Sequence, residues 1–351
     1  MYHVKLSETH YEAGYRWGRN LLDHGVQIKG SPTFELTEEK QWFSSKCEEE
    51  YRRYFPEILE EIQGIADGQN IPYPLLCTII FSIYCFQPQN KCTCFTIAER
   101  GNVIFGRNSD FLVSLEKFNL NCIYRLKESY AFQANTTAFV QMEDGVNQRG
   151  FAAGLTFVYP HVRKPGFNAG MLLRYLLEKC GSTAEAIEAL KSLPVASAQT
   201  LTLADRQGEI AVVECNPNDM AVVRPEPGEP FVVTANNFNA KEMRQYRNPE
   251  IDDWRSDERY KTAYTALKNH SGQYTIEFAQ SLLAGKYGFM CQYDRKQNAD
   301  TVWSVVYDLT EGCIYRAEGN PSRKRFQLDT RFQFAGETRP LSNKDGTEDK
   351  K

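Results

Sequence analysis

The change of pattern at Cys92 constrains the fold more than any other feature of this sequence. The first ninety residues are mainly helical in character. Apolar residues recur there at steps of four and three positions, at Tyr51, Phe55, Ile58, Ile62 and Ile65. This spacing predicts a helix face packed on a core. Pro56 suits the first turn of a helix, and Gly68 suits its end.

After Cys92 the sequence turns to short runs of strand-forming residues. Cys92–Glu99 and Val103–Arg107 are two such runs, and a turn at Arg100–Asn102 separates them. This pattern predicts a β-hairpin whose two strands lie side by side.

Further along the chain, helices interrupt the strands. Ala169–Leu193 predicts two helices broken at Gly181, with Ser182 and Glu185 as a capping box for the second. Strand-like runs follow at Thr200–Ala204, Glu209–Cys215, Met220–Arg224 and Phe231–Ala235. Antiparallel meanders are the simplest connection between them. A last strand pair is expected at Thr301–Tyr307 and Cys313–Ala317.

Length and charge limit the class of protein. The chain has 351 residues, of which 42% are hydrophobic, and its 41 Lys and Arg against 45 Asp and Glu give a formal net charge of -4. This balance is typical of a globular protein, and it provides no overall basic field for phosphate backbones or an anionic membrane. We therefore expect neither a nucleic acid nor a membrane as a partner.

Cysteine usage and the N-terminus indicate a soluble, cytoplasmic protein. The ten cysteines are scattered, without a disulfide framework or paired CxxC units, as is typical of a reducing compartment. Met1–Tyr11 has no basic stretch followed by an apolar core, so no secretory signal is expected. The longest apolar run, Leu75–Phe86, is too short to cross a bilayer as a helix.

Several common catalytic motifs are missing from the sequence. It contains no GxGxxG after a strand, no GxxxxGK(S/T), no HExxH and no GxSxG, which are the usual marks of dinucleotide, P-loop, zincin and esterase proteins. Of its five histidines, His161 or His270 would have to serve a Cys/His dyad, and nothing in the sequence places either near a cysteine. We expect no metal and no cofactor.

The stretch KCTCFTIAERGNVIFGRNSDF, residues 91–111, places unusual chemistry on the predicted hairpin. Its two ends meet, which would bring Arg107 and Asp110 beside Cys92. A nearby arginine favours the thiolate form of a cysteine. The alternative is a buried strand cysteine with a structural Arg/Asp pair, and composition alone leaves both interpretations open.

The motifs on this hairpin match a known pattern. The Cys92-Thr93 pair is followed by Gly-Arg-Asn-x-Asp at residues 106–110, with the arginine 15 positions after the cysteine. In this respect the sequence resembles the choloylglycine hydrolase and acyl-coenzyme A:6-aminopenicillanic acid acyltransferase family of N-terminal nucleophile hydrolases. Similar segments follow in order at Gly145–Leu155 (GVNQRGFAAGL), Met171–Pro194 and Val232–Phe238 (VVTANNF), with Arg259 in SDERY. The resemblance covers roughly Glu8–Gly319.

The resemblance implies a four-layer αββα sandwich and a self-processing mechanism. A cut between Lys91 and Cys92 would free an α-amino group on the residue that supplies the thiol. That amine, with an ordinary pKa of about 7.7 to 8.0, can accept the thiol proton near neutral pH. A histidine base is then not needed.

The resemblance also implies roles for individual residues. Cys92 would attack an amide carbonyl, and Asn236 with the backbone N–H of Asn147 would stabilise the oxyanion. Arg107 and Asp110 would orient the amine and thiol, and Arg259 would support the pocket. Asn236 could instead be a strand-end turn residue, because Asn237 and Asn239 lie close by, and Asn147 could equally be a simple turn residue.

A second cysteine is a rival for the nucleophile. Cys94 lies two residues after Cys92 and so shares its strand face, where it could be a nucleophile or a redox partner. Cys92 is favoured because Thr93 follows it and because its distance to Arg107 is closer to that of the family.

The expected organisation is a helical prosegment at residues 1–91, a catalytic domain at 92–340 and a disordered tail at 341–351. The expected activity is hydrolysis of a linear carbon-nitrogen amide bond in a small N-acyl substrate, through an acyl-enzyme on Cys92. Acyl transfer to an amine acceptor, or a catalytically silent binding protein of the same fold, are the alternatives. Bile-acid, penicillin and N-acyl amino acid amides all stay open as substrates, as does a homo-oligomer.

Overall fold

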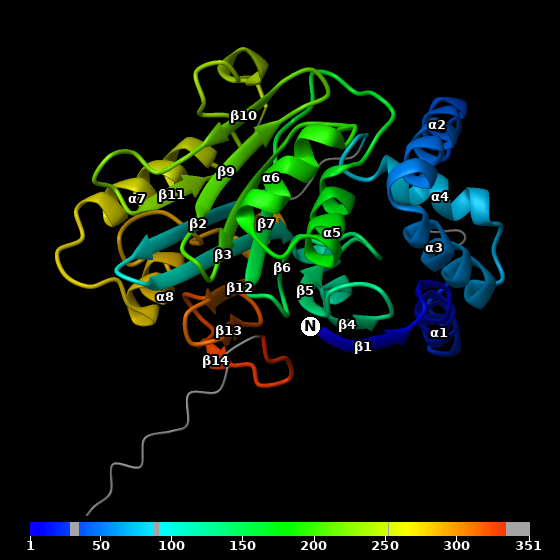
Figure 1. The fold of residues 1–351 in the computed structure, drawn as a ribbon, viewed down its shortest axis with the longest axis horizontal. Coiled ribbons are helices and arrows are strands. Elements are labelled where there is room, and N and C mark those ends of the chain that lie inside the picture. Colours follow the sequence, from blue (N-terminus) through cyan, green and yellow to red (C-terminus); the bar gives the residue numbers. More distant parts are fainter. Residues whose placement is uncertain (29–34, 87–90, 252, 335–351) are drawn as a thin grey trace, which may run out of the picture.

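The computed structural model describes residues 1–28, 35–86, 91–251 and 253–334 (Figure 1). Its strands form two sheets, and helices lie outside them. The tail expected at residues 341–351 lies outside the described residues, so its disorder stays a prediction.

The larger sheet has eight strands in the order β1-β4-β5-β6-β7-β8-β9-β10. They span Tyr2–Glu8 (β1), Leu120–Leu126 (β4), Phe132–Thr136 (β5), Asp144–Asn147 (β6), Phe151–Phe157 (β7), Gln199–Asp205 (β8), Ile210–Cys215 (β9) and Met220–Val223 (β10). Its neighbouring strands are antiparallel except for the parallel pair β1 and β4.

The smaller sheet has six antiparallel strands in the order β11-β2-β3-β12-β13-β14. They span Phe231–Thr234 (β11), Lys91–Glu99 (β2), Asn102–Leu112 (β3), Ala299–Asp308 (β12), Cys313–Ala317 (β13) and Gln327–Leu328 (β14). Short 3-10 helices occupy Val113–Phe118 (η1), Arg244–Tyr246 (η2) and Arg295–Gln297 (η3).

Strand alternation builds four layers from these two sheets. Cys94 of β2 faces a core between the sheets, where it packs with Phe105 of β3 and Ala152 of β7. Its neighbour Phe95 faces the other way, into a core with helices α7 (Ser256–Lys268) and α8 (Ile276–Leu283). Helices α5 (Ala169–Lys179) and α6 (Thr183–Ser192) pack on the outside of the larger sheet. The fold is therefore the four-layer αββα sandwich that the resemblance implied.

Helices α1 (His10–Asp23), α2 (Glu38–Tyr54), α3 (Pro56–Gln69) and α4 (Tyr73–Ser82) are grouped at one end of the molecule (Figure 1). They share a core with α5 and the larger sheet. The predicted apolar stripe is fully buried, although it runs across the end of α2 and along α3 instead of along one helix. Pro56 opens α3, as predicted.

Gly68 does not end α3, contrary to the prediction. The helix continues to Gln69, and Asn70 at φ 54° adopts the left-handed conformation that closes it. At Gly68 the backbone of α1 lies so close that a Cβ would meet the Tyr15 carbonyl oxygen at 2.5 Å. The glycine therefore serves the close packing of α1 on α3.

The prediction that the first ninety residues are mainly helical missed strand β1. It pairs in parallel with β4, and alternate residues Val4 and Leu6 face the core. That two-residue period was the signal for a strand. Because β1 joins the larger sheet, the described residues before Cys92 share both a sheet and a core with the rest of the described chain.

The other predicted elements are present, with some changes. The hairpin of β2 and β3 is longer than expected, and β12 pairs with β13 as expected. Ser182 caps α6, but Glu185 accepts a hydrogen bond from the Gly181 N–H and so does not complete a capping box. The meander holds for β8, β9 and β10, whereas β11 crosses to the smaller sheet and pairs with β2. That crossover places the end of β11 beside the start of β2.

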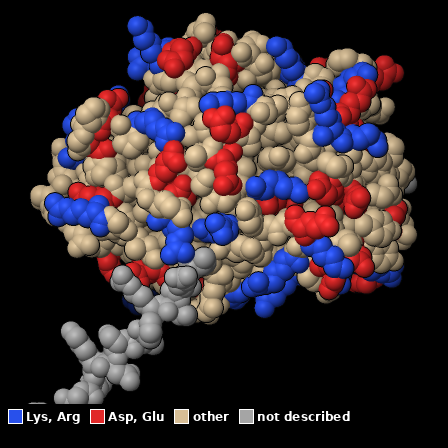
Figure 2. All heavy atoms as spheres, viewed as in Figure 1, with Lys and Arg blue, Asp and Glu red and all other residues tan. Residues whose placement is uncertain are grey.

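Charged side chains of both signs are interspersed over the face shown in Figure 2. This face therefore has no field of a single sign of the kind that steers phosphate backbones. Within the described residues, no helix combines the length and apolar character needed to cross a membrane.

Candidate active site

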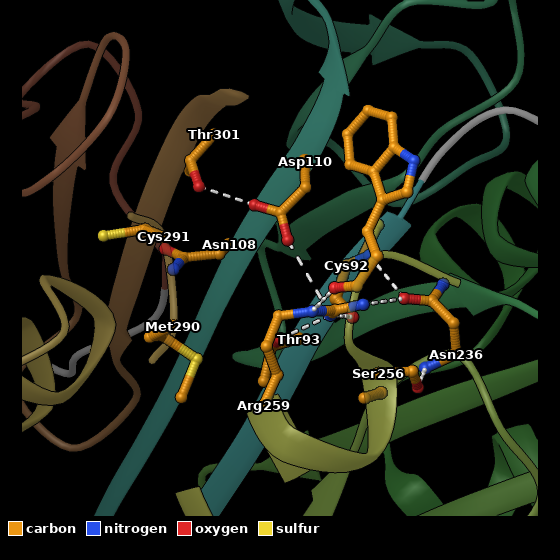
Figure 3. A network of polar contacts seen from close by, with 12 residues as sticks. Cys92, Thr93, Asn108, Asp110, Asn236, Ser256, Arg259, Met290, Cys291 and Thr301 are labelled. Carbon is orange, nitrogen blue, oxygen red and sulfur yellow. Dashed lines mark hydrogen bonds and ion pairs between the residues drawn. The ribbon is translucent and has the colours of Figure 1, made fainter. Parts of the chain in front are cut away.

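Cys92 lies near the start of β2 and is fully buried. Its backbone N–H donates to Asn236 Oδ1 at 2.9 Å, and its carbonyl oxygen accepts from Arg259 Nη1 at 2.6 Å (Figure 3). Its Sγ accepts from Arg107 Nη2 at 2.8 Å. Every polar group of this residue therefore has a partner that fixes its position.

Arg107 of β3 joins the cysteine to the opposite sheet. Besides the thiol, its guanidinium donates to the Leu155 carbonyl at 3.2 Å and to Asp144 Oδ2 at 2.8 Å, and it lies 3.7 Å from Glu143 Oε2. Leu155 belongs to β7, and Asp144 begins β6. The cation is thus held between two buried carboxylates and the sulfur.

The thiol is protonated at neutral pH in the continuous chain. Burial raises the pKa of the Cys92 thiol to about 12, and Arg107 opposes this rise because a cation favours the thiolate. A base beside the sulfur is therefore required for nucleophilic attack.

Cys94 has the environment of a core cysteine. Burial also raises the pKa of its thiol, and its side chain packs between the two sheets. The polar contacts of Asn236 and Arg259 go to Cys92 and Thr93 instead. Cys92 therefore stays the preferred nucleophile.

Asp144 belongs to this site, although it was not among the predicted site residues. Its carboxylate accepts hydrogen bonds from Arg107, Asn135, Trp303 and Tyr307, all of them buried. It comes directly before the Gly145–Leu155 segment that resembles the family. An acidic residue at that point was the only sequence signal for a partner of Arg107.

Asn236 and Arg259 both contact the backbone of Cys92 (Figure 3). Asn236 follows β11, and its Oδ1 accepts from Cys92 N–H and from Arg259 Nη2 at 2.8 Å. Its Nδ2 donates to the Phe157 carbonyl at 2.7 Å. Arg259 of α7 also donates to Thr93 Oγ1 at 2.8 Å. The crossover of β11 is what brings Asn236 to this position.

Asp110 lies at the end of the same network. Its Oδ1 accepts from Thr301 at 2.6 Å and its Oδ2 accepts from Tyr293 at 2.9 Å, while Arg259 Nη1 lies 3.7 Å from Oδ2. Burial raises the pKa of Asp110 to about 6, against the opposing effect of Arg259. This carboxyl group therefore changes charge in weakly acidic solution.

The raised pKa of Asp110 predicts a pH dependence of stability. Because its pKa rises from 3.8 to about 6 on folding, the contribution of this group is fully present below pH 3.8 and is lost as the pH rises through 6. The loss amounts to about 3 kcal/mol. Urea unfolding of the wild type and Asp110→Asn at pH 4 and pH 7 is expected to show this decrease only in the wild type. Equal changes in the two proteins would contradict the prediction.

The role that the resemblance gives Asn147 depends on its backbone N–H and stays a prediction, while its side chain contacts α5 and the following turn. Its side-chain nitrogen donates to the carbonyl oxygens of Leu177 and Cys180 at the end of α5, at 3.0 and 2.7 Å. Its Oδ1 accepts from the N–H groups of Arg149 and Phe151. These contacts hold a strand end against the outer helix layer.

The histidines make their contacts away from this site. All five lie in the described ranges. Nε2 of His161 lies 3.2 Å from the Arg247 carbonyl oxygen, and Nε2 of His270 lies 3.2 Å from that of Gln273. A Cys/His dyad at Cys92 therefore has no support.

The protein therefore has an αββα fold that holds a buried cysteine, Cys92, near the start of a strand within a network of polar contacts. Residues 97–323 match the family model described as acyl-coenzyme A:6-aminopenicillanic acid acyl-transferase. The chain belongs to this family, as the motifs implied. The match begins just after Cys92, so it covers Arg107, Asp110, Asn236 and Arg259.

Solved structures of acylases and hydrolases are similar to this chain. Penicillin V acylase from Agrobacterium tumefaciens is 16% identical over 65% of this chain and 82% of its own, with a TM-score of 0.44. Two structures of altered forms of the conjugated bile acid hydrolase from Clostridium perfringens are each 15% identical. One covers 69% of this chain and 98% of its own with a TM-score of 0.46, and the other covers 71% and 99% with a TM-score of 0.47. No curated protein matches the sequence.

Proposed function

We propose that this protein is a self-processing cysteine amide hydrolase that cleaves a linear C–N bond of a small N-acyl amide. The observation that carries the proposal is the buried Cys92, whose thiol, N–H and carbonyl oxygen each meet a polar partner. Membership of an acyltransferase family supports the same chemistry, since acyl transfer and amide hydrolysis share an acyl-enzyme.

Self-processing would supply the base that the buried thiol lacks. A cut between Lys91 and Cys92 turns the backbone nitrogen of Cys92 into an α-amine, and Asn236 Oδ1 already accepts from that nitrogen at 2.9 Å. An α-amine with a pKa of about 7.7 to 8.0 accepts the thiol proton near neutral pH. Arg107 then stabilises the thiolate.

The reaction follows from these groups. The sulfur of Cys92 bonds to the carbonyl carbon of the substrate, its proton moves to the α-amine, and an electron pair moves onto the carbonyl oxygen. The C–N bond then breaks, and the α-amine returns the proton to the departing amine. Water hydrolyses the thioester that remains, which releases a free acid and restores the thiol.

Asn236 is suited to stabilise the oxyanion of this reaction. An amide nitrogen carries two hydrogens. One of them is used by the Phe157 carbonyl, which leaves the second for the substrate. One preorganised donor of this kind contributes about 2.7 to 4 kcal/mol to the transition state.

Intact mass and N-terminal sequencing of the purified full chain test the proposal. We expect two fragments, the second beginning at Cys92. Cys92→Ala is expected to stay whole and inactive. Cys94→Ala is the matched control, because it removes a buried thiol from the same strand face and is expected to be cut and active. A wild-type chain that stays uncut, or a Cys92→Ala chain that is cut, would contradict the proposal.

Acyl transfer to an amine is the second candidate, and the description of the family favours it. The two reactions differ only in whether water or an amine attacks the thioester. A panel of penicillin, bile-acid and N-acyl amino acid amides, with and without an added amine acceptor, separates them. Release of free acid supports the hydrolase, and an acylated acceptor supports the transferase. If Cys92→Ala keeps full turnover, the thiol is not the nucleophile. The site around Cys92 would then belong to a catalytically silent binding protein.

A further inference from the structure

Strand β12 sends side chains to both sides of the cysteine network because its regular alternation is interrupted. Its pairing with β3 shifts register between Thr301 and Trp303. Residues two positions apart in a regular strand share a face. Here Thr301 donates to Asp110 Oδ1 at 2.6 Å (Figure 3). Trp303 turns instead toward the larger sheet, where it contacts Asp144 of β6. A β-bulge that re-aims a side chain in this way is frequent next to active sites.

Trp303 touches both members of the ion pair between Arg107 and Asp144. Its Nε1 donates to Asp144 Oδ2 at 2.8 Å, and the same oxygen accepts from Arg107 Nη1 at 2.8 Å. The guanidinium carbon of Arg107 lies 5.7 Å from the centroid of the indole ring, within the range of a cation–π contact. Trp303 is fully buried. The indole therefore contacts the cation with its ring and the carboxylate with its N–H.

Tyr307 binds the other oxygen of the same carboxylate. It lies four residues further along β12, and its hydroxyl donates to Asp144 Oδ1 at 2.7 Å. Its ring packs beside Phe105 of β3, with the two ring centroids 5.5 Å apart. Burial, and after it the charge of Asp144, raises the pKa of Tyr307 well above 10, so its hydroxyl stays a donor. Both oxygens of Asp144 thus accept a hydrogen bond from β12.

The position of Asp144 decides where the guanidinium of Arg107 points. A guanidinium is planar, so partners at Nη1 and Nε fix the direction of Nη2. Asp144 accepts from Nη1, and the Leu155 carbonyl accepts from Nε. Nη2 then donates to Cys92 Sγ at 2.8 Å. The donors from β12 also share the negative charge of Asp144, which leaves more of the field of Arg107 for the sulfur.

We propose that Trp303 and Tyr307 are positioning residues, which hold Asp144 so that Arg107 stays against the sulfur and favours its thiolate form. The inference rests on the proposed function, with Cys92 as nucleophile. Both residues act through Arg107, and neither exchanges a proton with the substrate. The bulge in β12 would then serve the reaction, since a regular strand would turn Trp303 to the face of Thr301.

Tyr307→Phe tests this role, because it removes only the hydroxyl. N-acyl p-nitroanilides with aliphatic, aromatic and steroid acyl groups serve as probes, and intact mass gives the fraction of chain that is cut. We expect kcat/KM per cut chain at pH 7 to fall about tenfold, because a hydrogen bond to a charged group is lost. The rising limb of the pH profile is expected to move to higher pH, so that the variant approaches the wild type in alkaline solution.

Tyr124→Phe is the matched control. Tyr124 of β4 is also fully buried, and its hydroxyl donates at 2.9 Å to Glu61, a partner of the buried Arg174. The two variants therefore lose the same kind of hydrogen bond, and their melting temperatures are expected to fall by similar amounts. Only Tyr307→Phe is expected to change the pH profile of kcat/KM.

Trp303→Phe is the second variant, since it keeps an aromatic ring but removes the N–H that Asp144 accepts. Its rising limb is expected to move in the same direction. A limb that stays in place in both variants of β12 overturns the inference, as does an equal move in Tyr124→Phe. A wild type that releases no nitroaniline, or a Cys92→Ala chain that releases as much as the wild type, rejects the proposed function instead, and the inference falls with it.

Discussion

Arg107→Met is expected to lower kcat/KM for amide cleavage by roughly 10²- to 10³-fold. Arg107 opposes the effect of burial on the Cys92 thiol more than Arg259 does, and the pKa of this thiol is about 12 in the continuous chain. Without the cation the thiol pKa rises further, and the thiolate fraction falls with it. The pH dependence of kcat/KM measures this shift as a move of its rising limb toward higher pH.

Arg107→Lys separates the charge of this residue from its geometry. A lysine keeps the positive charge between Glu143 and Asp144 but cannot reproduce the fork of donors to Cys92, Asp144 and Leu155. Its loss of activity is expected to be smaller than that of the methionine variant. Arg125→Met, an exposed arginine of β4, is the control and is expected to match the wild type. A limb that does not move in Arg107→Met would argue against the thiolate role.

Arg174→Met is expected to lower the free energy of unfolding by about 3 to 5 kcal/mol. Arg174 of α5 pairs with Glu61 of α3 at 2.6 Å and with Glu178 at 2.5 Å, and all three side chains are fully buried. The hydroxyl of Tyr124 donates to Glu61, and Nε2 of His10 lies 3.0 Å from Glu178. Removal of the arginine leaves two buried carboxylates without their cation. Urea unfolding at neutral pH measures the loss.

Lys179→Met is the matched control for this prediction. Lys179 also joins α5 to α3, through Glu57 at 2.7 Å, but the two side chains are 25% and 35% exposed. Such a pair contributes less than about 1 kcal/mol. A similar loss in both variants would show that the buried network has no special role in attaching the N-terminal helices.

The same network predicts how stability responds to acid. Burial alone would raise the pKa of Glu178, but Arg174 and His10 outweigh it and hold the pKa at about 2. Because this pKa is lowered on folding from 4.5, its contribution is present above pH 4.5 and is lost as the pH falls toward 2. The difference between the wild type and Arg174→Met should therefore shrink in that range.

Short-range patterns were enough to predict much of this fold. The hairpin around Arg100–Asn102 depends on neighbouring residues, and its register alone places Arg107 opposite Cys94 and near Cys92. The same applies to α5 and α6, where Ser182 begins the second helix. Local periodicity also indicated the burial of Tyr51 and Ile62.

Where the patterns failed, distant packing had decided the outcome. Gly68 was taken for a helix end, yet it lies inside α3 because α1 packs against it. The sequence gives no local sign that β11 leaves the meander to pair with β2.

The sequence by itself determined which residues could do the chemistry: a Cys-Thr pair, an arginine and a carboxylate on one hairpin, and an asparagine at a later strand end. Only the tertiary structure decided which groups hold Arg107 and Asn236, the partners of Cys92. Asp144, which binds Arg107, and the Phe157 carbonyl, which binds Asn236, both come from the facing sheet. The physical reason is that hairpin register follows from local backbone geometry, whereas contacts between sheets depend on the packing of the whole core.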